Sequence, residues 1–407
     1  MTETGTSPAQ NAAGSVEQPR TVAAAAGLLQ DTRGSVLLRG RGTKLDWAGR
    51  VDTPDLVLDT TELRGVLTHN PGDMTASARA GTPLAELQDH LAGSGQWLAL
   101  DPPTARAGAT VGGLLAAGDS GPSRLRYGGL RDLVIGVTLV LADGQVARSG
   151  GQVIKNVAGY DLAKLMYGSL GSLALVAEVV VRLHPRPPAS LTTAGAATPR
   201  QATAAALALM AGPLEPAALE WVSDDGSGGG SGQLLVRTDG TPSYVEAATE
   251  RVNALLATQG VPAHPLPGTD ATAAWRTQAD AVVGGAGEVV LRISGLPSDF
   301  GELAERSRRL AGECGLDLAV ASSVALGLHT VRLREGTPQD LARAVLGLRE
   351  AALAQGASVL LRSRPPELDD LLDPLGPPPS AVAVLRRVKE QFDPAGRLAP
   401  GRFRPWY

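Results

Sequence analysis

Short apolar runs alternate with Gly-rich turns over the first half of the chain. Short apolar runs bounded by Gly, Pro, Asn or Asp are typical of β-strands. This spacing predicts an α+β region that ends near Pro188. The strands are expected at residues 35–39, 56–59, 75–79, 97–100, 133–142 and 173–183.

Two helices are expected between these strands. Thr82 precedes Pro83, and a hydroxyl followed by proline at the first helical position favours a helix start there. A second helix is predicted over 161–167, with an apolar face formed by Leu162, Leu165 and Met166.

The pattern changes after the Pro-rich segment 184–188. Ala-rich helical stretches then alternate with strands expected at 288–294 and 317–322, which indicates a second domain. The sequence DDGSGGGSG at 224–232 is expected to be flexible, because glycine and serine have no side chain able to join a core. A Pro-rich segment at 372–379 precedes a last amphipathic helix at 380–392 and an aromatic tail, which is expected to dock. We therefore divide the chain into 1–20 (disordered), 21–188, 189–363 and 364–407.

Composition narrows the class of protein. With 407 residues, the chain is long enough for two or three domains. The balance of 37 basic and 41 acidic residues, without a block of like charge, disfavours a nucleic-acid partner. The amino terminus lacks the order of a signal peptide, and no apolar run reaches the roughly 18 residues of a membrane span. A cytoplasmic protein is expected.

Cys314 is the only cysteine of the sequence. A single thiol excludes an internal disulfide and an iron–sulfur cluster held by this chain alone, since such clusters need several thiolates. Electrons that leave this chain toward a cluster would need a partner that carries it.

The first candidate site is the segment RGRGTK at 39–44, directly after a predicted strand. Its glycines permit close approach, and successive backbone N–H groups can bind phosphate oxygens. The segment does not satisfy G-x-G-x-x-G, because Leu45 stands where the third glycine belongs. Taken alone, a Gly-rich turn is more often only a turn.

The second candidate site is the rigid segment from Asp101 to Gly118, which contains DPP and ATVGG. A helix that starts with two glycines is a second potential anion site. Two anion sites suit a dinucleotide pyrophosphate. The alternative is a helix packed tightly on its neighbour, which would also require small residues.

The third signal is KNVAGYDL at 155–162, followed by GSLGSLALVAEV at 168–179 and VRLHPRP at 181–187. With RGRGTK and ATVGG, this order resembles the FAD domain shared by vanillyl-alcohol oxidases, D-lactate dehydrogenases and glycolate oxidases, which is of the p-cresol methylhydroxylase (PCMH) type. KNVAGYDL and GSLG resemble in particular the FAD-binding E subunits of bacterial glycolate oxidases. The resemblance covers about 35–188 and returns in FDPAGRLAPGRF at 392–403.

The resemblance implies an α+β fold with a two-part PCMH-type FAD-binding domain (21–188), a ferredoxin-like cap (189–363) and a C-terminal segment (364–407) that returns to the FAD domain. For Asn156, Tyr160 and Asp161, a structural role in the turn is as credible as cofactor contact. The cofactor-binding residues that it implies are Gly40, Arg41, Gly42, Thr43, Lys44, Pro102, Thr110, Val111, Gly112, Gly113, Ser169, Gly171 and Val176.

Two departures from the wider family refine this expectation. Covalent members attach flavin through a histidine or cysteine near these loops; none occurs there, so FAD is expected to bind non-covalently. Members that oxidise 2-hydroxy acids carry H-x-G-D-G-N-x-H, which is absent, and no metal site is expected. In place of that motif, the nearest but weak candidates for binding a carboxylate are His329, Arg332 and Arg334, because guanidinium binds carboxylate bidentately. Residues at alternate positions of a strand, however, more often form only its solvent-exposed face.

The resemblance implies an FAD-binding subunit of a glycolate oxidase complex that acts on a small 2-hydroxy acid. A second FAD-binding subunit would hold the catalytic site, and an iron–sulfur subunit would pass electrons onward, with contact to the inner face of the membrane only through these partners. The alternatives are a free-standing 2-hydroxy-acid dehydrogenase and a scaffold that has lost flavin.

Overall fold

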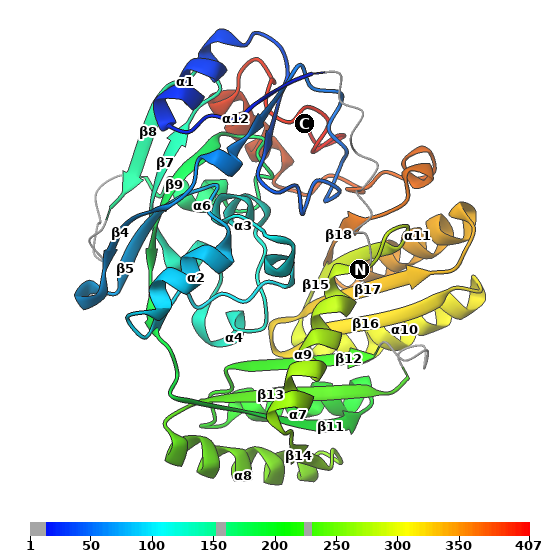
Figure 1. Cartoon of the computed structure of the whole chain (residues 1–407). Coiled ribbons are helices and arrows are strands. Elements are labelled where there is room, and N and C mark those ends of the chain that lie inside the picture. Colours follow the sequence, from blue (N-terminus) through cyan, green and yellow to red (C-terminus); the bar gives the residue numbers. More distant parts are fainter. Residues whose placement is uncertain (1–13, 152–159, 224–229) are drawn as a thin grey trace, which may run out of the picture.

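The structure is a computed structural model that describes residues 14–151, 160–223 and 230–407 (Figure 1). Residues 155–159 of the KNVAGYDL motif and most of the Gly-rich segment at 224–232 lie outside the described residues. No helix in the described part is long and apolar enough to cross a membrane.

The N-terminal part, from β1 to β10, contains two main sheets. Three parallel strands have the order β1-β3-β2, and five antiparallel strands have the order β4-β5-β9-β7-β8. The strands are β1 (Ser15–Glu17), β2 (Val36–Arg39), β3 (Leu56–Asp59), β4 (Val66–Asn70), β5 (Thr75–Arg79), β7 (Val134–Val140), β8 (Val146–Gly150) and β9 (Leu175–Arg182), with the short pair β6 (Gln96–Trp97) and β10 (His184–Pro185).

Helices cover both faces of the five-stranded sheet. One core lies between this sheet and α2 and α3, and a second core joins α1 to β3 and to the ends of β7 and β9. The helices of this part are α1 (Val22–Asp31), α2 (Leu84–Ala92), α3 (Val111–Ala117), α4 (Arg124–Tyr127), α5 (Leu130–Leu133) and α6 (Leu162–Met166).

The second part, from β11 to β18, is built on one eight-stranded sheet. The strand order β14-β11-β13-β12-β16-β17-β15-β18 places two βαββαβ units edge to edge, each with the ferredoxin-like order 4-1-3-2, and α9 joins them. The first unit comprises β11 (Ala189–Ala197), α7 (Pro199–Ala211), β12 (Ala218–Ser223), β13 (Gly232–Gly240), α8 (Pro242–Thr258) and β14 (Ala263–Pro265). After α9 (Gly268–Val283), the second comprises β15 (Val289–Ser294), α10 (Phe300–Glu313), β16 (Asp317–Ser323), β17 (Leu328–Arg334), α11 (Pro338–Ala354) and β18 (Ser358–Ser363).

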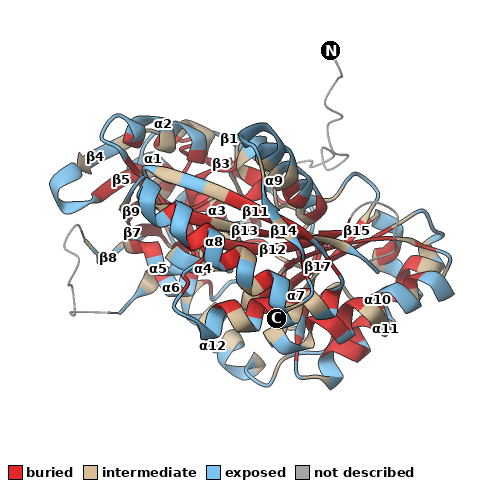
Figure 2. Cartoon of the chain, turned by 90° about the horizontal axis from the view of Figure 1, so that it is seen from below, coloured by how far each residue is buried: buried red, intermediate tan, exposed pale blue. Residues whose placement is uncertain are grey.

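The two faces of the eight-stranded sheet differ. Helices α7, α8, α10 and α11 cover one face and share its largest core with the strands, while α9 packs on the opposite face against β12, β16 and β17. Figure 2 shows buried residues running along these strands. The face that bears α9 is turned toward the N-terminal part, because α9 also contacts the short helix η3 (Pro103–Ala107) there.

The C-terminal segment returns to the N-terminal part, as expected. After helix α12 (Val382–Phe392), residue 398 pairs with Val36, and Arg397 donates to three backbone carbonyls of the N-terminal part. Figure 1 shows this red segment beside the blue N-terminal strands. The expected fold class is therefore confirmed.

Several local expectations need correction. Residues 15–17, assigned to a disordered terminus, pair with β3. Thr82 is not a helix cap: its hydroxyl donates to the Arg79 carbonyl, and α2 begins at Leu84 without a side-chain cap. The strand expected at 97–100 is reduced to β6, and Leu165 is 42% exposed, so it is no part of an apolar face.

Arg402 offers a test of how far the C-terminal tail stabilises the fold. Its buried guanidinium donates to the carbonyls of Leu45, Trp47 and Gly49 at 2.6–2.8 Å. Arg402→Met keeps the apolar stem but leaves these acceptors without a donor, so the free energy of unfolding, measured by chemical denaturation, should fall by about 2–4 kcal/mol. The control is Arg404→Met, because Arg404 pairs with Asp52 on the surface and should cost less than about 1 kcal/mol. Equal losses in both variants would contradict this role of Arg402.

Candidate functional site

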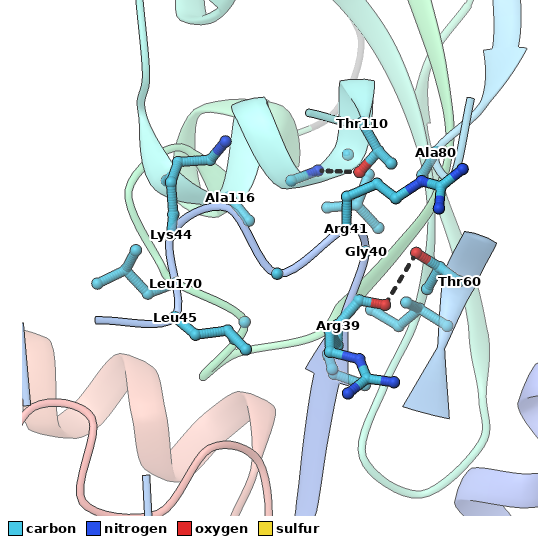
Figure 3. A pocket seen from close by; sticks show the side chains of 18 of the residues that line it. Arg39, Gly40, Arg41, Lys44, Leu45, Thr60, Ala80, Thr110, Ala116 and Leu170 are labelled. Atoms are coloured by element: carbon cyan, nitrogen blue, oxygen red, sulfur yellow. Dashed lines mark hydrogen bonds between the residues drawn. The ribbon is translucent and has the colours of Figure 1, made fainter. Parts of the chain in front are cut away.

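A pocket lies where three segments of the N-terminal part meet the C-terminal tail. The loop after β2, the start of α3 and the turn before β9 form its walls, and Arg402 closes one side. Figure 3 shows the loop passing in front of α3, with Gly40 and Arg41 beside Thr110. The lining residues are Leu38, Arg39, Gly40, Arg41, Gly42, Thr43, Lys44, Leu45, Thr60, Ala80, Thr110, Gly112, Gly113, Ala116, Ala117, Leu170, Gly171, Ala174, Leu175, Val176 and Arg402.

The loop after β2 offers free backbone donors to this pocket. The N–H groups of Arg41, Gly42, Thr43 and Lys44 donate to no acceptor within the described ranges of the chain. Gly42 has φ +71°, a left-handed conformation that L side chains adopt only with strain. Successive unpartnered N–H groups around a left-handed residue form a concave site for anionic oxygens.

The start of α3 differs from the expectation that it forms a second anion site. Its first three N–H groups already have acceptors in the protein: Val111 donates to the Thr82 carbonyl, Gly112 to the Ala80 carbonyl and Gly113 to the Thr110 hydroxyl. A helix start binds anions through free N–H groups. Only the loop at 41–44 therefore supplies free backbone donors among these two segments.

The glycines of α3 are explained by close packing. A Cβ on Gly112 would lie 2.5 Å from the Cβ of Ala80, and one on Gly113 would lie 3.0 Å from the Thr110 hydroxyl oxygen. The structure thus shows the tight helix packing that was the alternative explanation of these glycines. A bulky residue at position 112 would disturb the fold as well as the pocket.

The turn before β9 forms the opposite wall. Leu170 donates from its backbone to the Ala116 carbonyl at 2.7 Å, which ties the turn to α3. Gly171 adopts φ +77°, and a Cβ there would approach Leu38 at 3.5 Å. Next to them, the hydroxyl of Ser169 is buried and has no hydrogen-bond partner. A buried hydroxyl without a partner is costly, but Ser169 itself does not line the pocket.

Lys44 brings a buried cation to the pocket wall. Its ammonium group donates to the hydroxyls of Thr43 and Thr104 and lies 3.9 Å from the carboxylate of Asp119. Burial lowers the pKa of Lys44 to about 8, although the charge of Asp119 acts in the opposite direction. The amine therefore stays mainly protonated at neutral pH and presents a positive charge to an anionic ligand.

Most of the residues predicted from the sequence line this pocket. Pro102, Val111 and Ser169 do not: Pro102 precedes η3, Val111 is fully buried in the core, and Ser169 is buried outside the lining. Sequence reasoning missed Thr60, Ala80 and Arg402, which reach the pocket from other segments of the chain. The predicted residues that line the pocket are Gly40, Arg41, Gly42, Thr43, Lys44, Thr110, Gly112, Gly113, Gly171 and Val176.

His329, Arg332 and Arg334 do not form a common site. Alternation along β17 directs His329 toward α10, where its ring stacks on Phe300, and directs the two arginines to the opposite face. The expectation that these residues form a solvent-exposed face is also wrong, because His329 is fully buried and Arg332 is 7% exposed. Burial lowers the pKa of His329 to about 3, Arg332 pairs with Glu288 and Arg334 pairs with Asp317.

Comparison with known proteins shows which family the N-terminal segment resembles and which fold the chain shares. Residues 12–150 match the family described as FAD binding domain. The structure of p-cresol methylhydroxylase with substrate bound aligns with a TM-score of 0.70 at 17% identity, over 97% of this chain and 90% of that chain, which shows a shared fold. Residues 12–150 are thus similar to an FAD binding domain, and the chain has the fold of p-cresol methylhydroxylase.

In sequence, the chain is similar to glycolate oxidase subunit GlcE of Escherichia coli (strain K12), with 34% identity over 221 residues, 52% of this chain and 61% of that protein. It is 30% identical over 241 residues to glycolate oxidase subunit GlcD of Bacillus subtilis (strain 168), over 56% of this chain and 51% of that protein. The matches thus span less than two thirds of either relative. They confirm the resemblance first indicated by the sequence motifs.

Gly42→Val tests whether the loop at 41–44 holds the cofactor. A β-branched residue at φ +71° should reshape the loop, so we expect the Kd for FAD, measured by flavin fluorescence, to rise at least about tenfold. The matched control is Gly95→Val, since Gly95 has φ +64° and open space around it but does not line the pocket. Both variants should lose about 1–2 kcal/mol of stability through backbone strain. The same Kd in both variants would exclude the loop from cofactor binding.

Proposed function

We propose that this chain is the FAD-binding subunit of a glycolate oxidase complex that supports two-electron oxidation of a small 2-hydroxy acid. The observation that carries the proposal is the loop at 41–44 with its free N–H groups, inside a segment that matches an FAD binding domain. The similarity to GlcE and GlcD suggests the class of complex. Within it, 21–188 would bind FAD, 189–363 would form the cap and 364–407 would close the FAD-binding domain.

The residues of the pocket fit FAD. The loop at 41–44 would hold the phosphates, and Lys44 would supply positive charge. The apolar wall of Ala116, Leu170 and Val176 would exclude water from the bound cofactor. When bound, FAD supplies a two-electron acceptor for hydride from the hydroxylated carbon.

FAD should be bound without a covalent bond. The residues that line the described pocket include no histidine or cysteine, the side chains expected to attach flavin. Acid or heat should therefore release intact FAD into the supernatant, detected by absorption after the protein is precipitated. Flavin colour that stays with the denatured protein on a desalting column would contradict this assignment.

The isolated chain should hold FAD but not oxidise glycolate or D-lactate at a useful rate. Within the described residues, no group of three His, Cys, Asp or Glu side chains is placed to hold a metal, and no histidine lines the pocket. We expect turnover only with a second FAD-binding subunit and an iron–sulfur subunit, because Cys314 alone cannot ligate a cluster. The complex would act in the cytoplasm. If its partners bind the membrane, it would lie at the inner face.

The measurement is flavin bleaching and dye reduction with glycolate, for the chain alone and with both partners. Rapid, stoichiometric reduction of the chain alone would favour a free-standing dehydrogenase. A purified chain that binds no FAD would favour a scaffold.

A further inference from the structure

The turn at residues 169–172 has a strained backbone at Leu170. Its two central residues, Leu170 and Gly171, both have positive φ, at +50° and +77°. The Ser172 N–H donates to the Ser169 carbonyl at 3.0 Å and closes the turn. This is the pattern of a type I′ turn, in which glycine, asparagine or aspartate is usual. A leucine in the left-handed conformation costs free energy, because its Cβ crowds the backbone.

Strain by itself does not mark a functional residue. Met74, in the turn between β4 and β5, also has φ +50°, but it is 40% exposed and lies outside the pocket. Leu170 and Gly171, in contrast, both line the candidate FAD pocket, and Leu170 appears on the Lys44 side of it in Figure 3. The Leu170 side chain belongs to none of the apolar clusters of the described residues. Its strained position is therefore not explained by core packing.

The C-terminal segment holds this turn through a buried lysine. Lys389 of α12 donates to the Ser172 carbonyl at 2.8 Å and to the Leu398 carbonyl at 3.0 Å, and it pairs with Asp393 at 2.6 Å. The Lys389 side chain is 14% exposed, and that of Asp393 is fully buried. An ammonium group has three donors, and here each of them has an acceptor. The contact is thus more specific than a surface ion pair.

The partner of Lys389 also orders the tail. Asp393 accepts from the backbone N–H groups of Arg397 at 3.0 Å and Leu398 at 2.7 Å. On the other side of the turn, the Ser172 hydroxyl lies 3.5 Å from the Tyr407 hydroxyl. The conformation of the turn is therefore linked to the docked conformation of the C-terminal segment.

We propose that Lys389 is a positioning residue for the cofactor: it holds the Ser172 end of the turn, and the turn holds Leu170 against bound FAD. The identity of the cofactor is taken from the proposed function. A carbonyl fixed by a charged donor resists the backbone rotation by which a left-handed leucine would release its strain. A residue 217 positions away in the sequence thereby sets the shape of the pocket wall.

The test measures the Kd of the full chain for FAD by flavin fluorescence. Lys389→Met should raise the Kd at least about tenfold, because it removes the charge-assisted hydrogen bond to Ser172. Ser172→Ala loosens the same turn without leaving Asp393 unpaired, and it should raise the Kd about threefold through the loss of one ordinary hydrogen bond.

A double-mutant cycle separates positioning from a general loss of structure. Leu170→Gly removes the side chain and the strain together, so it should raise the Kd by itself and should melt higher than Leu170→Ala. Adding Lys389→Met or Ser172→Ala to Leu170→Gly should then change the Kd less than about twofold, since the turn no longer needs support. Independent effects would multiply.

Two controls are matched to these variants. Arg397→Met removes contacts of the same tail to the carbonyls of Leu29, Gly34 and Ala142, none of which lines the pocket. It should lower the melting temperature but leave the Kd unchanged at a temperature where the variant is folded. Met74→Gly relieves the same positive φ outside the pocket, and it should bind FAD like the parent protein.

An unchanged Kd in folded Lys389→Met overturns the proposal; if that variant does not fold, an unchanged Kd in Ser172→Ala overturns it. A rise in the Kd that multiplies with the effect of Leu170→Gly also overturns it. So does an equal rise in Arg397→Met, because either result assigns Lys389 to overall stability.

Failure of the positioning role is distinguishable from failure of the proposed function. A parent chain that binds FAD, with variants that bind it equally well, removes the positioning role and leaves the function. Coupled Kd values in a chain whose complete complex does not oxidise glycolate support the positioning role and remove glycolate oxidase as the function. A parent chain that binds no FAD removes both.

Discussion

The structure depends on two buried arginines that hold the segment at residues 45–49. Arg364, directly after β18, donates to the carbonyls of Asp46 and Ala48, and Arg402 of the tail donates to those of Leu45, Trp47 and Gly49. These carbonyls belong to no strand or helix, so the guanidinium groups take the place of a sheet partner. The loop at 41–44, which we propose to bind phosphate, ends where this segment begins. Its conformation is therefore fixed by residues more than 300 positions away.

Buried arginines near the boundary between the two parts of the chain differ in their hydrogen-bond partners. Arg364 and Arg402 have carbonyl acceptors and so stabilise the join between distant segments. Arg292 and Arg362, on the same sheet face as the well-paired Arg332, have no acceptors among the described residues. The negative charges of Glu220 and Asp119 oppose part of the cost of burying these two arginines, although neither acid forms a hydrogen bond with them.

Local signals in the sequence predicted the bounds of strands better than the caps and apolar faces of helices. Strands β3 and β5 were predicted with the observed bounds, and nearly all of their residues are buried. The pair Thr-Pro starts α7, α8 and α11 with a capping hydroxyl, yet at Thr82 the hydroxyl turns back to Arg79. The same dipeptide thus has different outcomes, decided by tertiary contacts. The second ferredoxin-like unit and the role of Arg402 were not predictable, since each depends on contacts between segments far apart in the sequence.

The structure changes the physical reason for preferring FAD over a monophosphate flavin. The sequence favoured FAD over a monophosphate flavin because two Gly-rich segments suggested two anion sites, but the donors of α3 are used within the protein. The glycines of α3 allow its approach to Ala80, whereas those of the loop leave N–H groups free. One loop with four free donors can hold both phosphates of a pyrophosphate, because its donors follow one another along the chain. The preference for FAD therefore rests on the match to an FAD binding domain and on a single loop, whereas the small residues of α3 allow this helix to pack closely on Ala80.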